Sequence, residues 1–183
     1  MLSHILSSPS LTNAALGLVL MHFLVGIFML ALAAIAFRRP ARNGTHTYGW
    51  LCIGISLYVI FYGLELITPG LKRAMLWSHI QYVGIAFIQS LALVFALLFS
   101  GKRERSVLRY IPYLALIPAF LVIAKFTDSL HGLIYREVYA EKIYGLLLLR
   151  ISGGPLYWVG IIYSNLIIIA GTWVLVRHIR RSK

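Results

Sequence analysis

The sequence predicts an all-α membrane protein, built as a bundle of five transmembrane helices. Hydrophobic residues make up 60% of its 183 residues and charged residues 12%, whereas soluble domains average about 45–50% and about 25%. The apolar residues gather in five runs, each long enough to cross roughly 30 Å of hydrocarbon, which takes about 20 helical residues. Despite a net charge of +12, the cations lie between these runs rather than on one soluble face, which argues against a nucleic-acid partner.

The five runs define the expected order of the chain. An extracytoplasmic segment, residues 1–13, contains no lysine or arginine. A transmembrane bundle is expected over residues 14–176, with spans at about 14–37, 48–68, 75–99, 108–126 and 156–176, followed by a basic tail at 177–183. The first run exceeds the core of a signal peptide and ends in Arg38 and Arg39 rather than a small-residue cleavage site, so we interpret it as a retained anchor. Pro155 suits the first turn of the fifth helix, because its missing N–H is not needed there.

Lysine and arginine divide unequally between the two sides of the predicted bundle. Eleven fall on one side: Arg38, Arg39, Arg42, Lys102, Arg103, Arg105, Arg109, Arg177, Arg180, Arg181 and Lys183. Six fall on the other: Lys72, Arg73, Lys125, Arg136, Lys142 and Arg150. Because cytoplasmic loops carry the excess of positive charge, we expect a multi-pass protein with its amino terminus outside and its carboxyl-terminal tail in the cytoplasm.

The connection at residues 128–154 is too long for a simple connector and holds three of the five acidic residues. Its stretch REVYAEKIYGLLLLRIS is rich in Val, Ile, Tyr and Leu with partial alternation, which predicts a short extracytoplasmic hairpin. Loops of this length usually have a function or are disordered. The apolar content here argues against disorder.

Glu65 is the only acidic residue inside a predicted span. An ionisable side chain at membrane depth is costly and normally faces the protein interior or water, with a partner. Lys125, at similar depth in the fourth span, is the candidate partner in a structural ion pair. The alternative is that both side chains snorkel to the interface.

Polar and aromatic side chains are expected to cluster in the same half of the bundle. Tyr58, Tyr62 and Glu65 follow an i, i+4, i+7 spacing, so they share one helix face. The expected cluster contains Tyr62, Glu65, Trp77, Gln81, Tyr82, Gln89, His131, Tyr135, Tyr163 and Asn165. Hydrogen bonds between helices would explain the same residues without a ligand.

Motifs for metal binding or catalysis do not appear in the sequence. Cys52 is the single cysteine, and the histidines show no His-x-x-x-His spacing, so we expect no metal site and no cofactor. There is no Gly-x-Ser-x-Gly element, no phosphate-binding loop and no pair of carboxylates on one span, so catalysis within this chain is not expected.

The stretch TDSLHGLIY, residues 127–135, after the proline-containing run LRYIPYLALIPAF, residues 108–120, resembles the amino-terminal seven-helix membrane region of bacterial sensor histidine kinases. In that family the fourth helix ends in a Thr-Asn-x-x-His-x-Leu-like element, which Thr127, His131 and Leu133 match, while Asp128 replaces the usual Asn. YGLEL at 62–66, Trp77 and QYVGI at 81–85 are similar to its second and third helices, as are the start of the fifth helix and Tyr163–Ser164. Gln89 stands about where the family usually has a proline, and the sequence ends after five spans where the family adds two.

The resemblance implies the sensory input region of a two-component kinase in the bacterial inner membrane. The catalytic kinase domain would then lie outside this chain, and a cytoplasmic kinase or other output domain, membrane lipid and a second copy in a homodimer would be its partners. An unknown small ligand or a membrane state would be sensed in the outer half of the bundle. The sensing candidates are Glu65, Trp77, Gln81, His131, Tyr135, Tyr62 and Tyr163.

Two other function classes stay open. A small transporter or channel subunit would use Glu65, Gln81 and Gln89 to line a pathway. A haem-binding membrane protein would need two facing histidines as ligands, and isolated histidines more often have packing or hydrogen-bonding roles.

Overall fold

The computed structural model describes residues 9–41, 44–143 and 145–181. In chain order its elements are α2 (Pro9–Arg38), α3 (Thr45–Ile67), α4 (Leu71–Phe99), α5 (Glu104–Leu108), α6 (Ile111–Phe126), α7 (Asp128–His131), β1 (Tyr135–Ile143), β2 (Leu146–Gly153) and α8 (Pro155–Arg181). Five helical segments are long and apolar enough to cross a membrane: Asn13–Arg38, Thr45–Ile67, Leu71–Phe99, Glu104–Phe126 and Pro155–Arg180. The predicted all-α membrane fold is therefore confirmed. The first residues of the expected amino-terminal segment and the last of the expected tail lie outside the described residues.

The fourth candidate span is the one that departs from a continuous helix. It consists of the short α5 followed by α6, with a turn at Arg109 and Tyr110 between them. Pro112 stands in the first turn of α6, where it cannot donate a backbone hydrogen bond to the preceding turn. The proline therefore favours a new helix start rather than continuation of α5.

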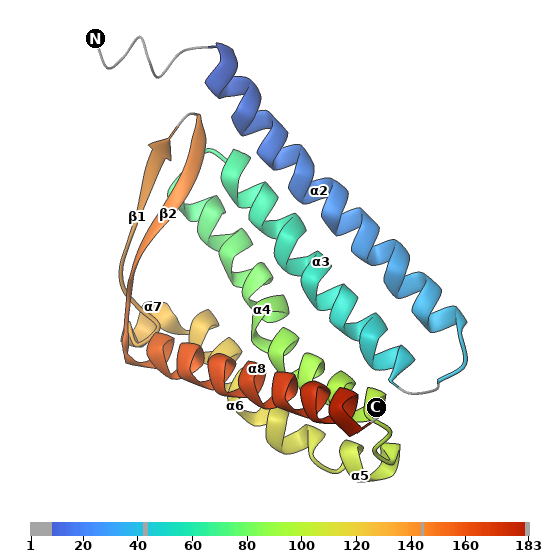
Figure 1. The fold of residues 1–183 in the computed structure, drawn as a ribbon. Coiled ribbons are helices and arrows are strands. Elements are labelled where there is room, and N and C mark those ends of the chain that lie inside the picture. The colour runs from blue at the N-terminus through green and yellow to red at the C-terminus, as the bar shows by residue number, and fades with distance from the viewer. Residues whose placement is uncertain (1–8, 42–43, 144, 182–183) are drawn as a thin grey trace.

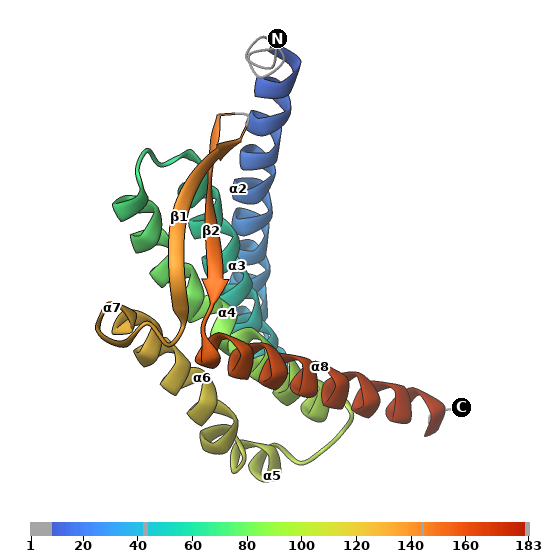
Figure 2. The same cartoon turned by 90° about the vertical axis from the view of Figure 1, so that its left-hand side faces the viewer.

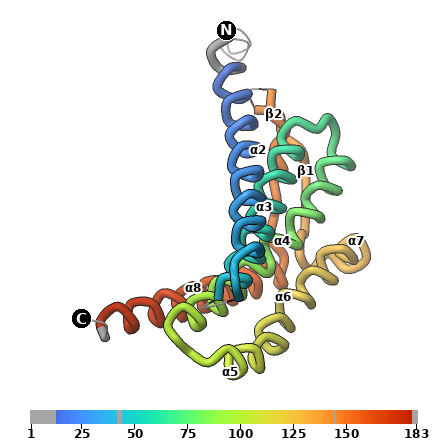
Figure 3. The backbone as a smooth tube through the Cα atoms, turned by 90° about the vertical axis from the view of Figure 1, so that its right-hand side faces the viewer, coloured from blue at the N-terminus to red at the C-terminus, as the bar shows by residue number. Residues whose placement is uncertain are grey.

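Helix α4 is central in the arrangement. It packs against α3 on one side and against α6 and α8 on the other, while α2 packs against α3. Figure 1 shows the α2–α3 pair and the α6–α8 pair on opposite sides of α4. Figures 2 and 3 show that α8 crosses the direction of α2, so its carboxyl-terminal end projects away from the α2–α3 pair.

Small residues allow α3 to approach both of its neighbours closely. A Cβ atom added to Gly84 of α4 would lie 2.5 Å from the carbonyl oxygen of Gly54 in α3, so this crossing has no room for a larger residue. On the other face of α3, the Ser56 hydroxyl donates a hydrogen bond of 2.9 Å to the Gly26 carbonyl oxygen of α2. Small residues and hydroxyl groups at helix crossings are typical of association within a membrane.

The outer surface of the helices is apolar, as a lipid-facing surface requires. Leu24 of α2 is 68% exposed and Ile169 of α8 is 65% exposed. Only 6% of the apolar window of α8 is buried inside the protein. Contiguous exposed apolar surface of this extent is not found on soluble monomers.

The predicted hairpin is also confirmed. Strands β1 and β2 pair antiparallel from Tyr135 opposite Gly153 to Ile143 opposite Leu146, with an irregularity between Tyr135 and Glu137. The hairpin runs beside α3 and α4, with β2 contacting both helices (Figures 1 and 2). At its base, Leu121, Ala124, Ile134 and Tyr135 form a buried cluster that joins α6 to the hairpin.

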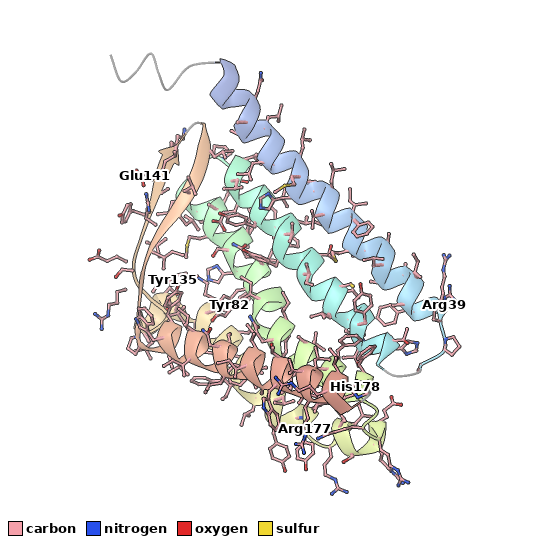
Figure 4. The ribbon with its side chains drawn as sticks, in the orientation of Figure 1. Arg39, Tyr82, Tyr135, Glu141, Arg177 and His178 are labelled. Carbon is pink, nitrogen blue, oxygen red and sulfur yellow. The ribbon has the colours of Figure 1, made fainter. Side chains whose placement is uncertain are left out.

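Charged residues segregate between the two ends of the bundle. Figure 4 shows Arg39 at the end of α2 and Arg177 near the end of α8 on the same side of the molecule, where α5 also lies, and Glu141 of the hairpin at the opposite side. We refer to these as the basic end and the hairpin end. Arg39 and Arg177, two of the cations that the sequence assigns to one side, thus lie at the basic end.

Candidate functional site

A cavity of about 450 Å³ lies between α3, α4, α8 and the hairpin. Volumes of this size accept small molecules. Its wall combines aromatic, aliphatic and polar side chains: Tyr58, Tyr62, Glu65, Ser78, Gln81, Tyr82, Ile85, Ala86, Gln89, Leu121, Tyr135, Leu148, Leu149, Ile151, Tyr157, Gly160, Ile161, Tyr163, Ser164 and Asn165. The helix periodicity of α3 and α4 explains why several of these polar residues face one way.

Glu65 places a carboxylate in this wall although only 4% of the residue is exposed. Gln81 of α4, itself 6% exposed, donates a hydrogen bond from Nε2 to Glu65 Oε2. The Glu65 carboxylate thus lines the cavity with an amide of α4 beside it.

Two amide oxygens in the same wall also lack donors. Gln81 Oε1 and Gln89 Oε1 are buried, and within the described part of the chain neither has a hydrogen-bond partner. Buried acceptors are normally satisfied, so unpartnered ones in a cavity wall need an explanation, such as a bound molecule. Both residues belong to α4 and line the cavity.

Lys125 does not form the predicted ion pair with Glu65. Its side chain is completely buried, and its ammonium lies 3.4 Å from the centroid of the Tyr135 ring, with no hydrogen-bond partner in the described residues. Gln81 of α4 contacts the Glu65 carboxylate, and the Lys125 ammonium lies against the ring of Tyr135. The two charged groups interact electrostatically without direct contact. Snorkelling is excluded as well, since neither side chain reaches the surface of the protein.

Tyr135 connects the hairpin to the cavity. Burial raises the pKa of its phenol, against the opposing effect of a hydrogen bond with Ser78. The phenol is therefore neutral at physiological pH, and the Lys125 ammonium interacts with the face of a neutral ring. Figure 4 shows Tyr82 and Tyr135 near the base of the hairpin, where Tyr82 packs against the cluster that contains Tyr135.

Asp128 fixes the turn that leads into β1. Its two carboxylate oxygens accept the backbone N–H groups of Ile134, at 2.8 Å, and Tyr135, at 3.0 Å. The backbone N–H of Gly132 donates to the Asp128 carbonyl oxygen at 2.7 Å, and Gly132 adopts a left-handed φ of 61° that closes the turn. A single Asp side chain therefore orients the strand that carries Tyr135 into the cavity wall.

His131 belongs to this turn and not to the cavity. Its Nδ1 accepts the Leu133 backbone N–H at 3.0 Å, and its Nε2 lies 3.2 Å from the Thr127 hydroxyl. Trp77 is also outside the cavity wall: its indole N–H donates to the Thr68 hydroxyl at 2.9 Å, and its ring lies against Phe61. Both side chains support the polypeptide around the site.

Three helices meet at a hydrogen-bonded junction that adjoins the cavity. Pro118 inside α6 has no N–H to donate to the Leu114 carbonyl oxygen one turn earlier. The Tyr163 hydroxyl of α8 donates to that oxygen at 2.6 Å, and the Ser90 hydroxyl of α4 lies 3.0 Å from it. The two hydroxyls are 2.8 Å apart. We call Ser90, Leu114, Pro118 and Tyr163 the proline junction.

Five of the seven sensing candidates line the cavity: Glu65, Gln81, Tyr62, Tyr135 and Tyr163. Trp77 and His131 do not, and the sensing role of all seven stays a prediction. The sequence reasoning did not single out Tyr157, Ser78 or the aliphatic residues of β2 as site residues. Tyr58 carried a usable signal, because it shares the helix face of Tyr62 and Glu65.

Among the described residues, no group of three or more His, Cys, Asp and Glu side chains could hold a metal ion. His22 and His79 make hydrogen bonds to the carbonyl oxygens of Leu18 and Met75 in their own helices. The cavity is a feature of the described residues that could accept a ligand.

One comparison with known proteins identifies a family. A family model described as the N-terminal 7TM region of histidine kinase matches residues 21–183. No curated protein and no solved structure matches the chain. The region that the family model describes is a sensory region and not a catalytic one. The chain, a membrane protein with five candidate spans, belongs to the family of N-terminal seven-transmembrane regions of histidine kinases.

Proposed function

We propose that this chain binds a small ligand in the cavity between α3, α4, α8 and the hairpin and relays its presence to a cytoplasmic output domain. The observation that carries the proposal is the buried wall of Glu65, Gln81 and Gln89, in which the amide oxygens of Gln81 and Gln89 have no donor from the described residues. A bundle that only needed stable packing would gain nothing from unpartnered buried acceptors. A ligand that occupies the cavity supplies their missing partners.

The proline junction supports a route from the cavity to the basic end. Tyr163 both lines the cavity and donates to the Leu114 carbonyl oxygen. A ligand that displaces the Tyr163 ring therefore moves the contact by which α8 is held to α4 and α6. Helix α8 is little buried in the protein, and α4 is its main neighbour. A ligand shifts such an equilibrium only if it binds one arrangement better than the other.

The distribution of charge supports an orientation for this relay. The basic end would face the cytoplasm and the hairpin end the outside, in accordance with the positive-inside rule. In spheroplasts, a membrane-impermeant thiol reagent is then expected to label Glu137→Cys of the hairpin and not Arg103→Cys, each in a Cys52→Ala background. Labelling of Arg103→Cys alone would reverse the orientation.

A cavity-filling substitution tests the relay without a known ligand. Ala86 lines the cavity, so Ala86→Phe adds a ring where a ligand would lie. Spin labels at Arg39→Cys and Ile179→Cys, in the Cys52→Ala background, report the distance between the basic ends of α2 and α8. We expect Ala86→Phe to change the mean distance by about 1–2 Å or more, the scale of helix shifts in known switches.

Ala34→Phe is the matched control, because Ala34 lies in an exposed position of α2 and the same ring is added away from the cavity. It should leave the distance distribution unchanged. If Ala86→Phe folds with normal helicity and the distribution also stays unchanged, cavity occupancy does not reach the basic end and the proposed relay is wrong.

The transporter or channel alternative is supported by one observation. Glu65, Gln81 and Gln89, which that hypothesis assigns to a pathway, all line the cavity. Flux of a small solute across vesicles reconstituted with the protein, abolished by Glu65→Gln, would favour this function. Binding without flux favours the sensor.

A further inference from the structure

We infer that the cavity binds a small organic cation, a protonated amine that carries an apolar body. This inference rests on the proposed ligand site and specifies the chemistry of the ligand. It comes from the distribution of acceptors, rings and charges around the cavity.

Two buried oxygens of the cavity wall lack a hydrogen-bond partner among the described residues, the amide oxygens of Gln81 and Gln89. Beside them lies the Glu65 carboxylate, which accepts a hydrogen bond from Gln81. A protonated amine carries up to three N–H donors and no acceptor, which complements this set. Gln81 and Gln89 are eight residues apart, or about 12 Å along a helix, so an amine near Glu65 leaves Gln89 available to a second donor on the ligand.

The cavity wall contains no side chain that would attract an anion. Among the described residues that line it, Glu65 is the only Asp or Glu, and none is Lys, Arg or His. A carboxylate or phosphate in this cavity would lie near the Glu65 carboxylate without a compensating cation, which is unfavourable in a site of low dielectric constant.

The buried lysine of this region interacts with two carboxylates. Lys125 is the buried cation of this region, and it interacts electrostatically with Asp128 more strongly than with Glu65. The carboxylate of Asp128 also accepts two backbone N–H groups. Glu65 is thus the acidic residue of the cavity wall, and the hydrogen bond to its carboxylate comes from the uncharged Gln81.

Aromatic rings complete the match to a cation. Six tyrosines line the cavity: Tyr58, Tyr62, Tyr82, Tyr135, Tyr157 and Tyr163. The faces of aromatic rings attract ammonium groups, and aromatic surroundings are a recurrent solution for binding organic cations. The protein already uses one of these rings in this way, since the Lys125 ammonium lies 3.4 Å from the centroid of Tyr135. Leu148 and Leu149 of β2 and Ile85 of α4 offer apolar contacts for the rest of the ligand.

Three probes of equal size test the sign of the charge. 2-Phenylethylamine is a cation at neutral pH, 2-phenylethanol is neutral and phenylacetate is an anion. Binding to the full chain in lipid nanodiscs is measured by isothermal titration calorimetry, with empty nanodiscs subtracted because amphipathic amines also enter lipid. We expect the amine to bind at least 10-fold more tightly than the alcohol, and phenylacetate to bind most weakly.

Substitutions assign this preference to the cavity. Glu65→Gln keeps the shape of the side chain and should reduce the preference for the amine over the alcohol to less than 3-fold. Glu137→Gln is the matched control, because Glu137 is an exposed acid of β1 outside the cavity wall; it should leave all three affinities unchanged. Ala86→Phe should weaken the binding of the amine and Ala34→Phe should not.

Each other outcome has a defined meaning. Equal affinities for amine and alcohol, tighter binding of phenylacetate, or an amine preference that survives Glu65→Gln overturns the cation inference. If the alcohol binds and Ala86→Phe abolishes its binding, the result still supports the cavity as a ligand site. The absence of binding by all three probes also overturns the inference. The relay is tested separately, by the spin-label distances.

Discussion

The proline junction makes a quantitative prediction about how α6 is held in the bundle. Because Pro118 lacks an N–H, the Leu114 carbonyl oxygen depends on the hydroxyls of Tyr163 and Ser90, at 2.6 and 3.0 Å. Removing one interhelical hydrogen bond in a membrane costs about 0.6 kcal/mol on average and about 1.7 kcal/mol at most. Tyr163→Phe and Ser90→Ala, each alone, should therefore lower the free energy of unfolding by about 1 kcal/mol.

The double variant should be more costly than the two single variants added together. When both hydroxyls are missing, the Leu114 carbonyl oxygen is left without a donor, which adds about 1–3 kcal/mol for an unsatisfied buried acceptor. The expected total is about 3–5 kcal/mol, with a coupling of about 1–3 kcal/mol between the two sites. Tyr113→Phe, in which a 73% exposed tyrosine of α6 is changed, is the control and should have almost no effect.

A third substitution identifies the carbonyl oxygen as the shared acceptor. Pro118→Ala restores an N–H that can donate to Leu114 within the helix, so the coupling between Ser90→Ala and Tyr163→Phe should disappear in that background. The assay is unfolding of the purified protein from mixed micelles by SDS, followed by circular dichroism and tryptophan fluorescence. A coupling of the same size with Pro118 and with Ala at this position would refute the assignment.

Three further predictions concern packing and the hairpin. Gly84→Ala should lower the free energy of unfolding in SDS by about 1–3 kcal/mol because the α3–α4 crossing has no room for a methyl group, whereas Gly17→Ala, with nothing within 4 Å, should not. Asp128→Ala should speed amide hydrogen exchange at the start of β1. Asp128→Asn should speed it less, because one acceptor oxygen remains. Equal exchange rates in the unchanged protein and both variants would contradict the role given to the carboxylate. Glu141→Gln, which removes the exposed pair with Arg150 at 2.7 Å, should leave the melting temperature nearly unchanged, because exposed ion pairs contribute little to stability.

The number and position of the helices could be predicted from sequence because the length of apolar runs is a local property. The hairpin could be predicted for a similar reason, since β-forming residues follow one another along the chain. The shared face of Tyr62 and Glu65 likewise follows from the helical repeat. These properties depend on neighbours in sequence, and the structure agrees with them.

The partners across helices could not be predicted in the same way. Glu65 and Lys125 have similar depth, but depth does not determine rotation about the helix axis, and Gln81 rather than Lys125 contacts the carboxylate. The proline junction required the spatial meeting of α4, α6 and α8, of which the sequence shows only Pro118. The run of leucines in β2 lacks strict alternation, so the sequence does not indicate which of them face the cavity.

The hairpin determines how deeply the protein sits in the bilayer. The sheet of the described residues has two strands, so each strand has one edge whose backbone groups no third strand pairs. Such edges are not tolerated in hydrocarbon, where water cannot satisfy them. The hairpin must therefore stay in the headgroup or aqueous region, and because it runs beside α3 and α4 (Figure 2), the adjacent turns of these helices must rise out of the hydrocarbon with it. A thicker bilayer would bring this sheet toward the lipid, so lipid chain length should alter the tilt of the bundle and, with it, the position of β2 at the cavity wall.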